Sequence, residues 1–218
     1  MNPAPRNISV TLSAGLLLVL LTLLLAYLLT GLQSRVARTP HLRVIGTVND
    51  FTLTNQTGAA SSLADLRGRV WIADIIFTRC PGPCLKMTRQ MKELQDALPV
   101  TEKTRLVTLT TDPEFDTPPV LEKYAARFDA DTNRWIFLTG TKKEVGALAA
   151  GGLKLSAVEV KPAERQSESD LFIHSTRFVI VDQQARLRGV FDTEGEGADW
   201  KAEKQKILAA VKQLEREP

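Results

Sequence analysis

The sequence predicts an α/β protein in which a central mixed β-sheet is flanked by helices, and three observations carry this prediction. Nearly continuous apolar runs rich in β-branched residues predict buried strands. Segments with apolar side chains at helical spacing separate these runs. Strands and helices therefore alternate along the chain, which is the pattern of a layered α/β fold.

Three strands and three helices are expected in alternation. The strands are RVWIADIIF (69–77), RLVTLTTD (105–112) and RWIFLTG (134–140). The helical period of LKMTRQMKELQDAL (85–98) predicts the first helix. Thr117 and Pro118 have the character of an N-cap and a first-turn proline and predict the start of the second. TKKEVGALAA (141–150) predicts the third.

Two hairpins, a loop and a final helix complete the predicted domain. DFTLTNQTGAASSL (50–63) predicts a small hairpin with its turn near Thr57 and Gly58. TRFVIVD and RLRGVF, separated by QQA (176–191), predict a second hairpin. The polar stretch 161–170 predicts a mobile loop. Helical spacing of apolar residues over 199–217 predicts the C-terminal helix.

The N-terminal part has a different character. VTLSAGLLLVLLTLLLAYLLTGL (Val10 to Leu32) is almost wholly apolar, and about 20 such residues span a bilayer as a helix. A cleaved signal peptide is the alternative, but its apolar region is shorter and ends in small residues, whereas this run ends TGLQSRVART. The predicted organisation is a tail (1–9), a transmembrane anchor (10–32), a linker (33–43) and one domain (44–218).

Charge narrows the setting of the protein. The chain of 218 residues has a net charge of +3 and shows no Lys/Arg cluster with interleaved aromatics, so nucleic acid is not an expected partner. The short N-terminal tail, with Arg6 alone, is unlike an organelle transit peptide and favours a bacterial protein. Arg35, Arg38 and Arg43 follow the apolar run, so flanking charge does not favour a cytoplasmic N-terminus.

Both cysteines of the chain lie in FTRCPGPC (77–84), between the first predicted strand and helix. A helix N-terminus stabilises negative charge and is expected to lower a thiol pKa. Cys80 and Cys84 are spaced i, i+4, which places them on one face if the turn is helical, and the intervening prolines stiffen the loop and remove hydrogen-bond donors. A dithiol at this strand-to-helix turn is typical of a thioredoxin-like fold.

Several uses of the dithiol stay open. Structural zinc needs four ligands, which would recruit both histidines, His41 and His174. Copper needs fewer ligands: soft thiolates select Cu(I), and imidazole from His174 also suits copper. Met87 and Met91 share a helical face with Cys84, but methionines at this spacing more often fill a core.

Redox and structural roles are the remaining alternatives. A thiol-disulfide oxidoreductase of thioredoxin type uses the same dithiol, although its usual spacing is C-x-x-C. A peroxidase of the peroxiredoxin class shares the fold, and the nearness of the second cysteine argues against it. A purely structural disulfide is not needed, because a domain of this size can bury a sufficient core.

Several segments together resemble the SCO/SenC family of membrane-anchored, thioredoxin-like copper chaperones. They are FTRCPGPC, TTDPEFDTPPVLEKYAARF, RWIFLTG and IHSTRFVIVDQQARLRG. The resemblance implies ligation of copper, Cu(I) or Cu(II), by Cys80, Cys84 and His174. It implies a non-enzymatic role in assembling the dinuclear copper centre of cytochrome c oxidase, by copper delivery to its copper-bearing subunit, by thiol reduction, or by both.

The resemblance also bears on the setting and on individual residues. It implies a cytoplasmic-membrane protein whose domain lies on the extracytoplasmic side, supplied by a copper-donor chaperone. The chain departs from the family at the PGP between the cysteines and at Ile173, where an Asp is common. Asp112 and Asp116 match the family's acidic segment, and their expected roles are a helix N-cap and turn carboxylates rather than ligands.

Overall fold

The computed structural model describes residues 15–27, 42–165, 171–194 and 199–217. It divides into two compact units, Met1–His41 and Leu42–Pro218. The first unit is described only as a helix over 15–27. No helix within these described ranges is long and apolar enough to cross a membrane. The other residues of the predicted anchor, 10–14 and 28–32, lie outside the described part of the chain.

The second unit is built on a mixed eight-stranded sheet with the order β1-β10-β9-β4-β5-β6-β2-β3. Strands β4, β5 and β6 pair in parallel, and the remaining neighbours pair antiparallel. The strands are β1 (Gly46–Thr47), β2 (Thr52–Asn55), β3 (Ala60–Ser62), β4 (Val70–Ile76), β5 (Thr104–Thr110), β6 (Trp135–Thr139), β9 (Arg177–Val181) and β10 (Arg186–Asp192). The expected mixed sheet is therefore confirmed.

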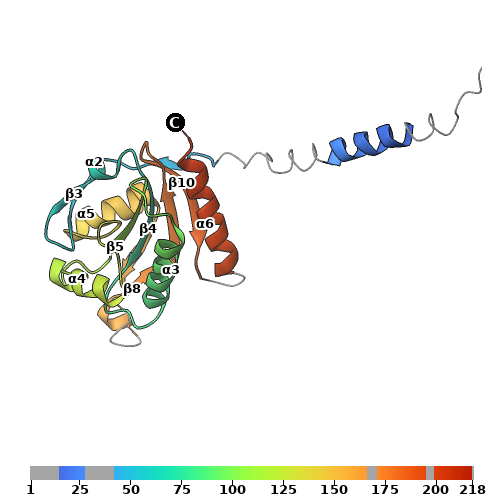
Figure 1. The fold of residues 1–218 in the computed structure, drawn as a ribbon. Helices are drawn as coiled ribbons and strands as arrows, with labels where there is room; N and C mark the ends of the chain where they lie inside the picture. Colours follow the sequence, from blue (N-terminus) through green and yellow to red (C-terminus); the bar gives the residue numbers. More distant parts are fainter. Residues whose placement is uncertain (1–14, 28–41, 166–170, 195–198, 218) are drawn as a thin grey trace, which may run out of the picture. The chain divides into compact units, whose positions relative to one another are not determined.

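Helices cover both faces of this sheet (Figure 1). They are α2 (Leu63–Leu66), α3 (Pro83–Ala97), α4 (Pro118–Arg127), α5 (Lys142–Gly146), which continues as the π-helix Ala147–Leu153, a 3-10 turn (Pro162–Glu164) and α6 (Trp200–Leu214). Thr117 is the N-cap of α4, as its sequence predicts. The third helix ends three residues later than expected.

Alternation along β4 creates two cores. Side chains of successive strand residues point to opposite faces of a sheet. Val70, Ile72 and Ile76 lie in the core shared with α3, α4 and α6. The intervening residues Trp71 and Ile75 lie in the core shared with α2, α5 and the π-helix. Both faces of β4 are thus buried, which explains its nearly uninterrupted apolar sequence.

The structure contains a second, two-stranded sheet that the sequence did not predict. Strands β7 (Ala157–Glu159) and β8 (Phe172–His174) pair antiparallel and form a ribbon outside the main sheet. The ribbon lies at the opposite end of the domain from the C-terminal end of α6 (Figure 1). Of the loop predicted over 161–170, the structure describes the 3-10 turn and Arg165, and residues 166–170 lie outside the described part.

Candidate metal centre

The two cysteines lie where β4 ends and α3 begins. Pro83 occupies the first turn of α3, where the missing N–H costs nothing. The backbone N–H of Cys80 donates to the carbonyl of Phe77 at 3.2 Å, which closes the turn after the strand. The backbone N–H of Phe77 in turn donates to Sγ of Cys84 at 3.5 Å. Phe77 at the strand end therefore contacts the backbone of Cys80 and the sulfur of Cys84.

Both thiols are buried and reduced, and they contact each other through a side-chain hydrogen bond. Burial raises the pKa of the Cys84 thiol far above its ordinary value, and the hydrogen bond with Cys80 raises it further. The N–H of Phe77 acts in the opposite direction and is the smaller effect. The expectation that the helix N-terminus lowers the thiol pKa is wrong for Cys84, because the loss of hydration outweighs the helix dipole.

The raised pKa of Cys84 predicts a steep pH dependence of metal binding. A metal takes the thiolate, so the proton on Cys84 must leave, and affinity falls as pH falls. Each thiol proton released changes the apparent affinity about tenfold per pH unit. We expect Cu(I) affinity measured by competition to rise by up to about 100-fold per unit between pH 6 and 8. An affinity independent of pH in this window would contradict a protonated resting dithiol.

Asp116 positions the segment that leads into Cys80. Its carboxylate is fully buried and accepts hydrogen bonds from the hydroxyls of Thr78 and Thr110 and from the backbone N–H of Thr78 at 3.1 Å. Burial raises the pKa of Asp116, against the opposing effect of these donors. The prediction that Asp116 is a cap or turn carboxylate describes only part of its role. Thr117 is the N-cap of α4, and Asp116 joins the dithiol segment to the end of β5.

Replacing Asp116 by alanine is expected to destabilise the domain by about 2 kcal/mol or more, because three hydrogen-bond donors on Thr78 and Thr110 lose their acceptor. The dithiol segment would also lose its attachment to β5, so Cu(I) affinity should fall with stability. Urea unfolding together with a copper titration measures both. Asp116→Asn keeps the volume and one acceptor oxygen and should lose less in each. Equal stability of Asp116→Ala and wild type would exclude this role.

Asp112 lies beside the same segment. Its carboxylate forms an ion pair with Arg79, whose guanidinium also covers the ring of Phe115 at 4.0 Å. The backbone N–H of Asp112 donates to Oγ1 of Thr110 at 2.9 Å. Arg79 directly precedes Cys80, so the ion pair with Asp112 restrains the loop that carries the first cysteine. These contacts give Asp112 a supporting role and do not indicate that it binds a metal.

A buried acid beneath the dithiol was not anticipated. Asp74 is fully buried in the centre of β4, and Oδ1 accepts from the hydroxyl of Thr108 at 2.7 Å. Nε1 of Trp135 donates to the same hydroxyl at 2.9 Å. The negative charge of Asp74 also helps to raise the pKa of Cys84, although burial and the hydrogen bond with Cys80 have larger effects. The available sequence signal was an acidic residue inside an otherwise apolar strand.

The ribbon brings β8, the strand of His174, to the end of β4. The ring of Phe172 lies 5.2 Å from the ring of Phe77, whose N–H binds Cys84. The backbone of His174 pairs with Ala157 of β7. The side chain of His174 lies outside the described part of the structure, and so does all of His41. Among the described residues there is no group of three or more His, Cys, Asp or Glu side chains that could hold a metal ion.

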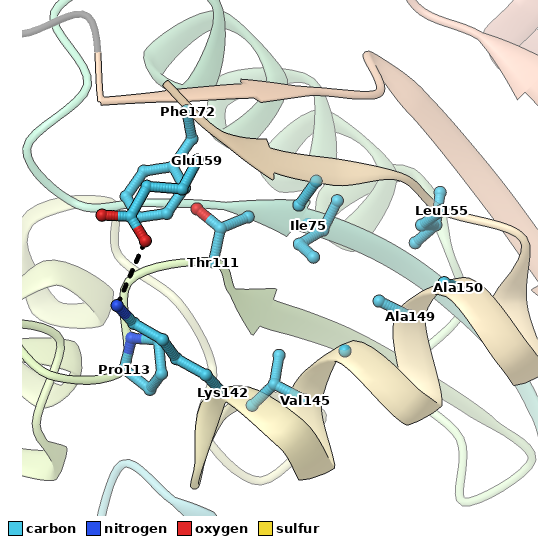
Figure 2. Close-up of a pocket in the computed structure, with 12 residues that line it drawn as sticks. Ile75, Thr111, Pro113, Lys142, Val145, Ala149, Ala150, Leu155, Glu159 and Phe172 are labelled. Atoms are coloured by element: carbon cyan, nitrogen blue, oxygen red, sulfur yellow. Dashed lines mark hydrogen bonds and ion pairs between the residues drawn. The ribbon is translucent and has the colours of Figure 1, made fainter. Parts of the chain in front are cut away.

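The ribbon covers a cavity of about 160 Å³ on the other side of Phe172 (Figure 2). Ile75, Val145 and Leu155 contribute to its largely apolar wall. Nζ of Lys142 reaches Oε2 of Glu159 on β7 at 3.2 Å, and it also lies 3.3 Å from Glu114. These ion pairs are partly exposed, and each contributes little to stability. The ring contact between Phe172 and Phe77 also attaches the ribbon to the domain.

Met87 and Met91 are completely buried in the core between β4, α3 and α6. This burial supports the interpretation of both residues as core filling. Both cysteines belong to the same core, and the site as described is built on their two sulfurs.

The fold and the dithiol define a class of protein: a thioredoxin-like α/β domain with two convergent, buried thiols after its first central strand. Two soft donors in contact suit a thiophilic metal ion such as Cu(I) and also suit reversible disulfide formation.

Comparison with known proteins gives the family. Residues 43–209 match the family model described as SCO1/SenC. The SCO1 protein homolog of Bacillus subtilis (strain 168) is 36% identical over 142 residues, which cover 64% of this chain and 70% of that protein. The chain therefore belongs to the SCO1/SenC family.

Solved structures agree with this assignment. BsSco, a member of the Sco family of cytochrome c oxidase assembly proteins in which a disulfide switch was identified, is 30% identical with a TM-score of 0.65. The match covers 80% of this chain and 96% of BsSco. Yeast Sco1 with copper bound is 24% identical over 77% of this chain and 89% of its own, with a TM-score of 0.62, and supports the fold.

Proposed function

We propose that this chain is a copper-binding chaperone that assists assembly of the dinuclear copper centre of cytochrome c oxidase. The observation that carries the proposal is the pair of buried thiols, Cys80 and Cys84, in mutual hydrogen-bond contact at the start of α3. Relatives support it: BsSco is an oxidase assembly protein, and yeast Sco1 has been solved with copper. Soft thiolates select Cu(I) over harder divalent ions.

In this proposal His174 supplies a third ligand. Imidazole binds both oxidation states of copper, and β8 is held beside the dithiol through Phe172 and Phe77. Two thiolates give a net charge of −1 with Cu(I) and 0 with Cu(II). Neither state leaves a large charge buried, so the same ligands serve both oxidation states.

Copper is cargo in this function. A copper-donor chaperone supplies the ion, and the copper-bearing subunit of the oxidase receives it. The thiols give up their protons when the ion enters, and they recover protons when it leaves. The high pKa of Cys84 therefore favours release, because reprotonation stabilises the empty site.

Thiol reduction is the second candidate role, and the contact between the two sulfurs favours it. Forming the disulfide between Cys80 and Cys84 releases two electrons and two protons. These electrons and protons convert one client disulfide into two thiols, so the exchange balances without a further reductant. Metal-independent reduction of the client by the protein would favour this role over copper delivery.

We also propose that the apolar segment from Val10 to Leu32 anchors the protein as a single span in the cytoplasmic membrane. Its length and composition support this. Under this proposal the domain lies on the extracytoplasmic side, and the copper centre of the oxidase is assembled there.

A Cu(I) competition titration on the full chain in detergent, reduced beforehand, tests the proposed function. One tightly bound equivalent per chain is the expected result. Reduction of a disulfide-bearing client domain, with and without copper, then separates delivery from reduction. Binding of no Cu(I) by the reduced chain would overturn the proposed chaperone function.

A further inference from the structure

A basic, partly apolar hollow of about 460 Å³ lies between the loop after α3 and the last turns of α6. Pro99, Leu208 and Val211 contribute its apolar lining, and Lys103, Lys212 and Arg216 contribute three positive charges. Val100, beside Pro99, is 83% exposed. We call this surface the α6 hollow. It takes no part in the dithiol site.

The α6 hollow lies at the end of the sheet opposite the dithiol. The hydroxyl of Thr104, the first residue of β5, donates to Glu215 at 2.7 Å, and Thr104 pairs with Val70 at the start of β4. The dithiol follows the other end of β4. Seven strand residues separate the two ends, which corresponds to roughly 20 Å.

The chain enters the domain beside this hollow. The guanidinium of Arg188 donates to the carbonyl oxygen of Leu42, the first residue of the second unit, at 2.7 and 3.0 Å. The same guanidinium reaches Glu217, the neighbour of Arg216, at 2.8 Å. The linker from the apolar segment therefore joins the domain within one side chain of the α6 hollow.

The α6 hollow keeps an excess of positive charge. Within the described part of the chain, no ion pair involves Lys103, Lys212 or Arg216. Glu215 is the acidic residue of the lining and accepts a hydrogen bond from Thr104, so three cations and one carboxylate give the hollow a net positive charge. Nearby Glu102 is already paired with Arg105 and Arg69.

We infer that the α6 hollow is a docking surface for an anionic bilayer, with Val100 and the apolar lining at the interface and the three cations against lipid phosphates. This inference rests on the proposed membrane anchoring. Three features select lipid as the occupant: the entry of the anchor linker beside the hollow, the excess of positive charge, and the exposed side chain of Val100 next to the lining residue Pro99. Docking this end directs the dithiol away from the membrane and towards its client.

Site-specific fluorescence on the full chain in vesicles tests the inference. A Cys80→Ser, Cys84→Ser chain with Val100→Cys is labelled with an environment-sensitive fluorophore and reconstituted in phosphatidylcholine vesicles with or without phosphatidylglycerol. With the anionic lipid we expect a blue shift of the emission and quenching by spin-labelled lipid. A label at Phe115→Cys, at the dithiol end, should show neither change. Salt near 1 M, where the Debye length is about 3 Å, should reverse the shift at Val100→Cys.

Charge removal provides the matched control. Lys103→Ala, Lys212→Ala and Arg216→Ala together should reduce the docking equilibrium roughly 100-fold, at about fivefold per cation. Arg89→Ala, Lys123→Ala and Lys143→Ala remove the same exposed charge elsewhere and should leave docking intact. Circular dichroism of both triple variants checks that they fold.

Flotation of the vesicles separates the two proposals. A chain that does not float with the vesicles would overturn the anchor and the docking surface together. A chain that floats while the label at Val100→Cys shows no dependence on phosphatidylglycerol would overturn the docking surface alone. Equal effects of the two triple variants would also overturn it.

Discussion

Replacing Cys80 or Cys84 by serine is expected to weaken Cu(I) binding by more than about 100-fold, since the loss of outer partners of a metal site alone costs 10- to 100-fold. A hydroxyl is a hard, weakly acidic donor and does not substitute for a thiolate towards Cu(I). The two sulfurs lie in contact, so each variant leaves a single soft donor. Competition with a Cu(I) chelator of known affinity measures the loss.

The same titration tests His174 against matched controls. His174→Ala should weaken binding of both Cu(I) and Cu(II), whereas His41→Ala should change neither. Met87→Leu and Met91→Leu remove the nearby thioethers at nearly constant volume and should leave copper affinity unchanged. Unaltered binding in His174→Ala would reduce the site to a dithiol and favour the reductase role. A loss in either methionine variant would show that a core sulfur reaches the metal.

The central strands could be predicted because a strand buried on both faces has a nearly continuous apolar sequence. Every residue of β4 is buried, and its run of β-branched residues reflects that. The ribbon of β7 and β8 could not be predicted in the same way. Each strand has three residues, and all of β7 is exposed, so neither period nor apolarity distinguishes it from a loop. The third helix extends to Leu153 because Leu148 and Leu153 both reach the core.

The candidate site could also be predicted only in part, where local sequence determines it. The position of the dithiol followed from local sequence, because a strand, two prolines and a helix fix it. The acidity of Cys84 did not, since burial by residues far away in the sequence decides its pKa. The role of Asp116 depends on Thr78, which lies 38 residues earlier. Residue spacing within one segment cannot indicate a contact between segments so far apart. The threonines and acids around Asp116 are also typical of an ordinary turn.

Replacing Arg188 by methionine is expected to destabilise the domain by about 3 kcal/mol, the lower end of the cost of removing one partner of a buried ion pair, because Asp182 keeps Arg186 as a partner. The Arg188 and Asp182 side chains are almost fully buried and lie 2.6 Å apart. Arg188 also holds Glu217 and the carbonyl of Leu42, so one guanidinium joins both ends of the domain to the hairpin of β9 and β10. Urea unfolding measures the change.

The pH dependence and two controls make this prediction specific. Although burial acts to raise it, hydrogen bonds from Arg188 and Arg186 hold the pKa of Asp182 below its ordinary value. The stabilisation is therefore present above the ordinary aspartate pKa of about 4, and it is lost as pH falls through the lower folded value. Arg186→Met removes the more exposed partner of the same carboxylate and should cost much less.

A chain beginning at Val44 lacks the Leu42 carbonyl, so it should lose part of the same stability. Its loss and that of Arg188→Met should sum to more than the loss measured for the combined variant, because both changes remove one shared contact. Full additivity would mean that the start of the domain is held by other contacts, and the position of the linker beside the α6 hollow would then not depend on Arg188.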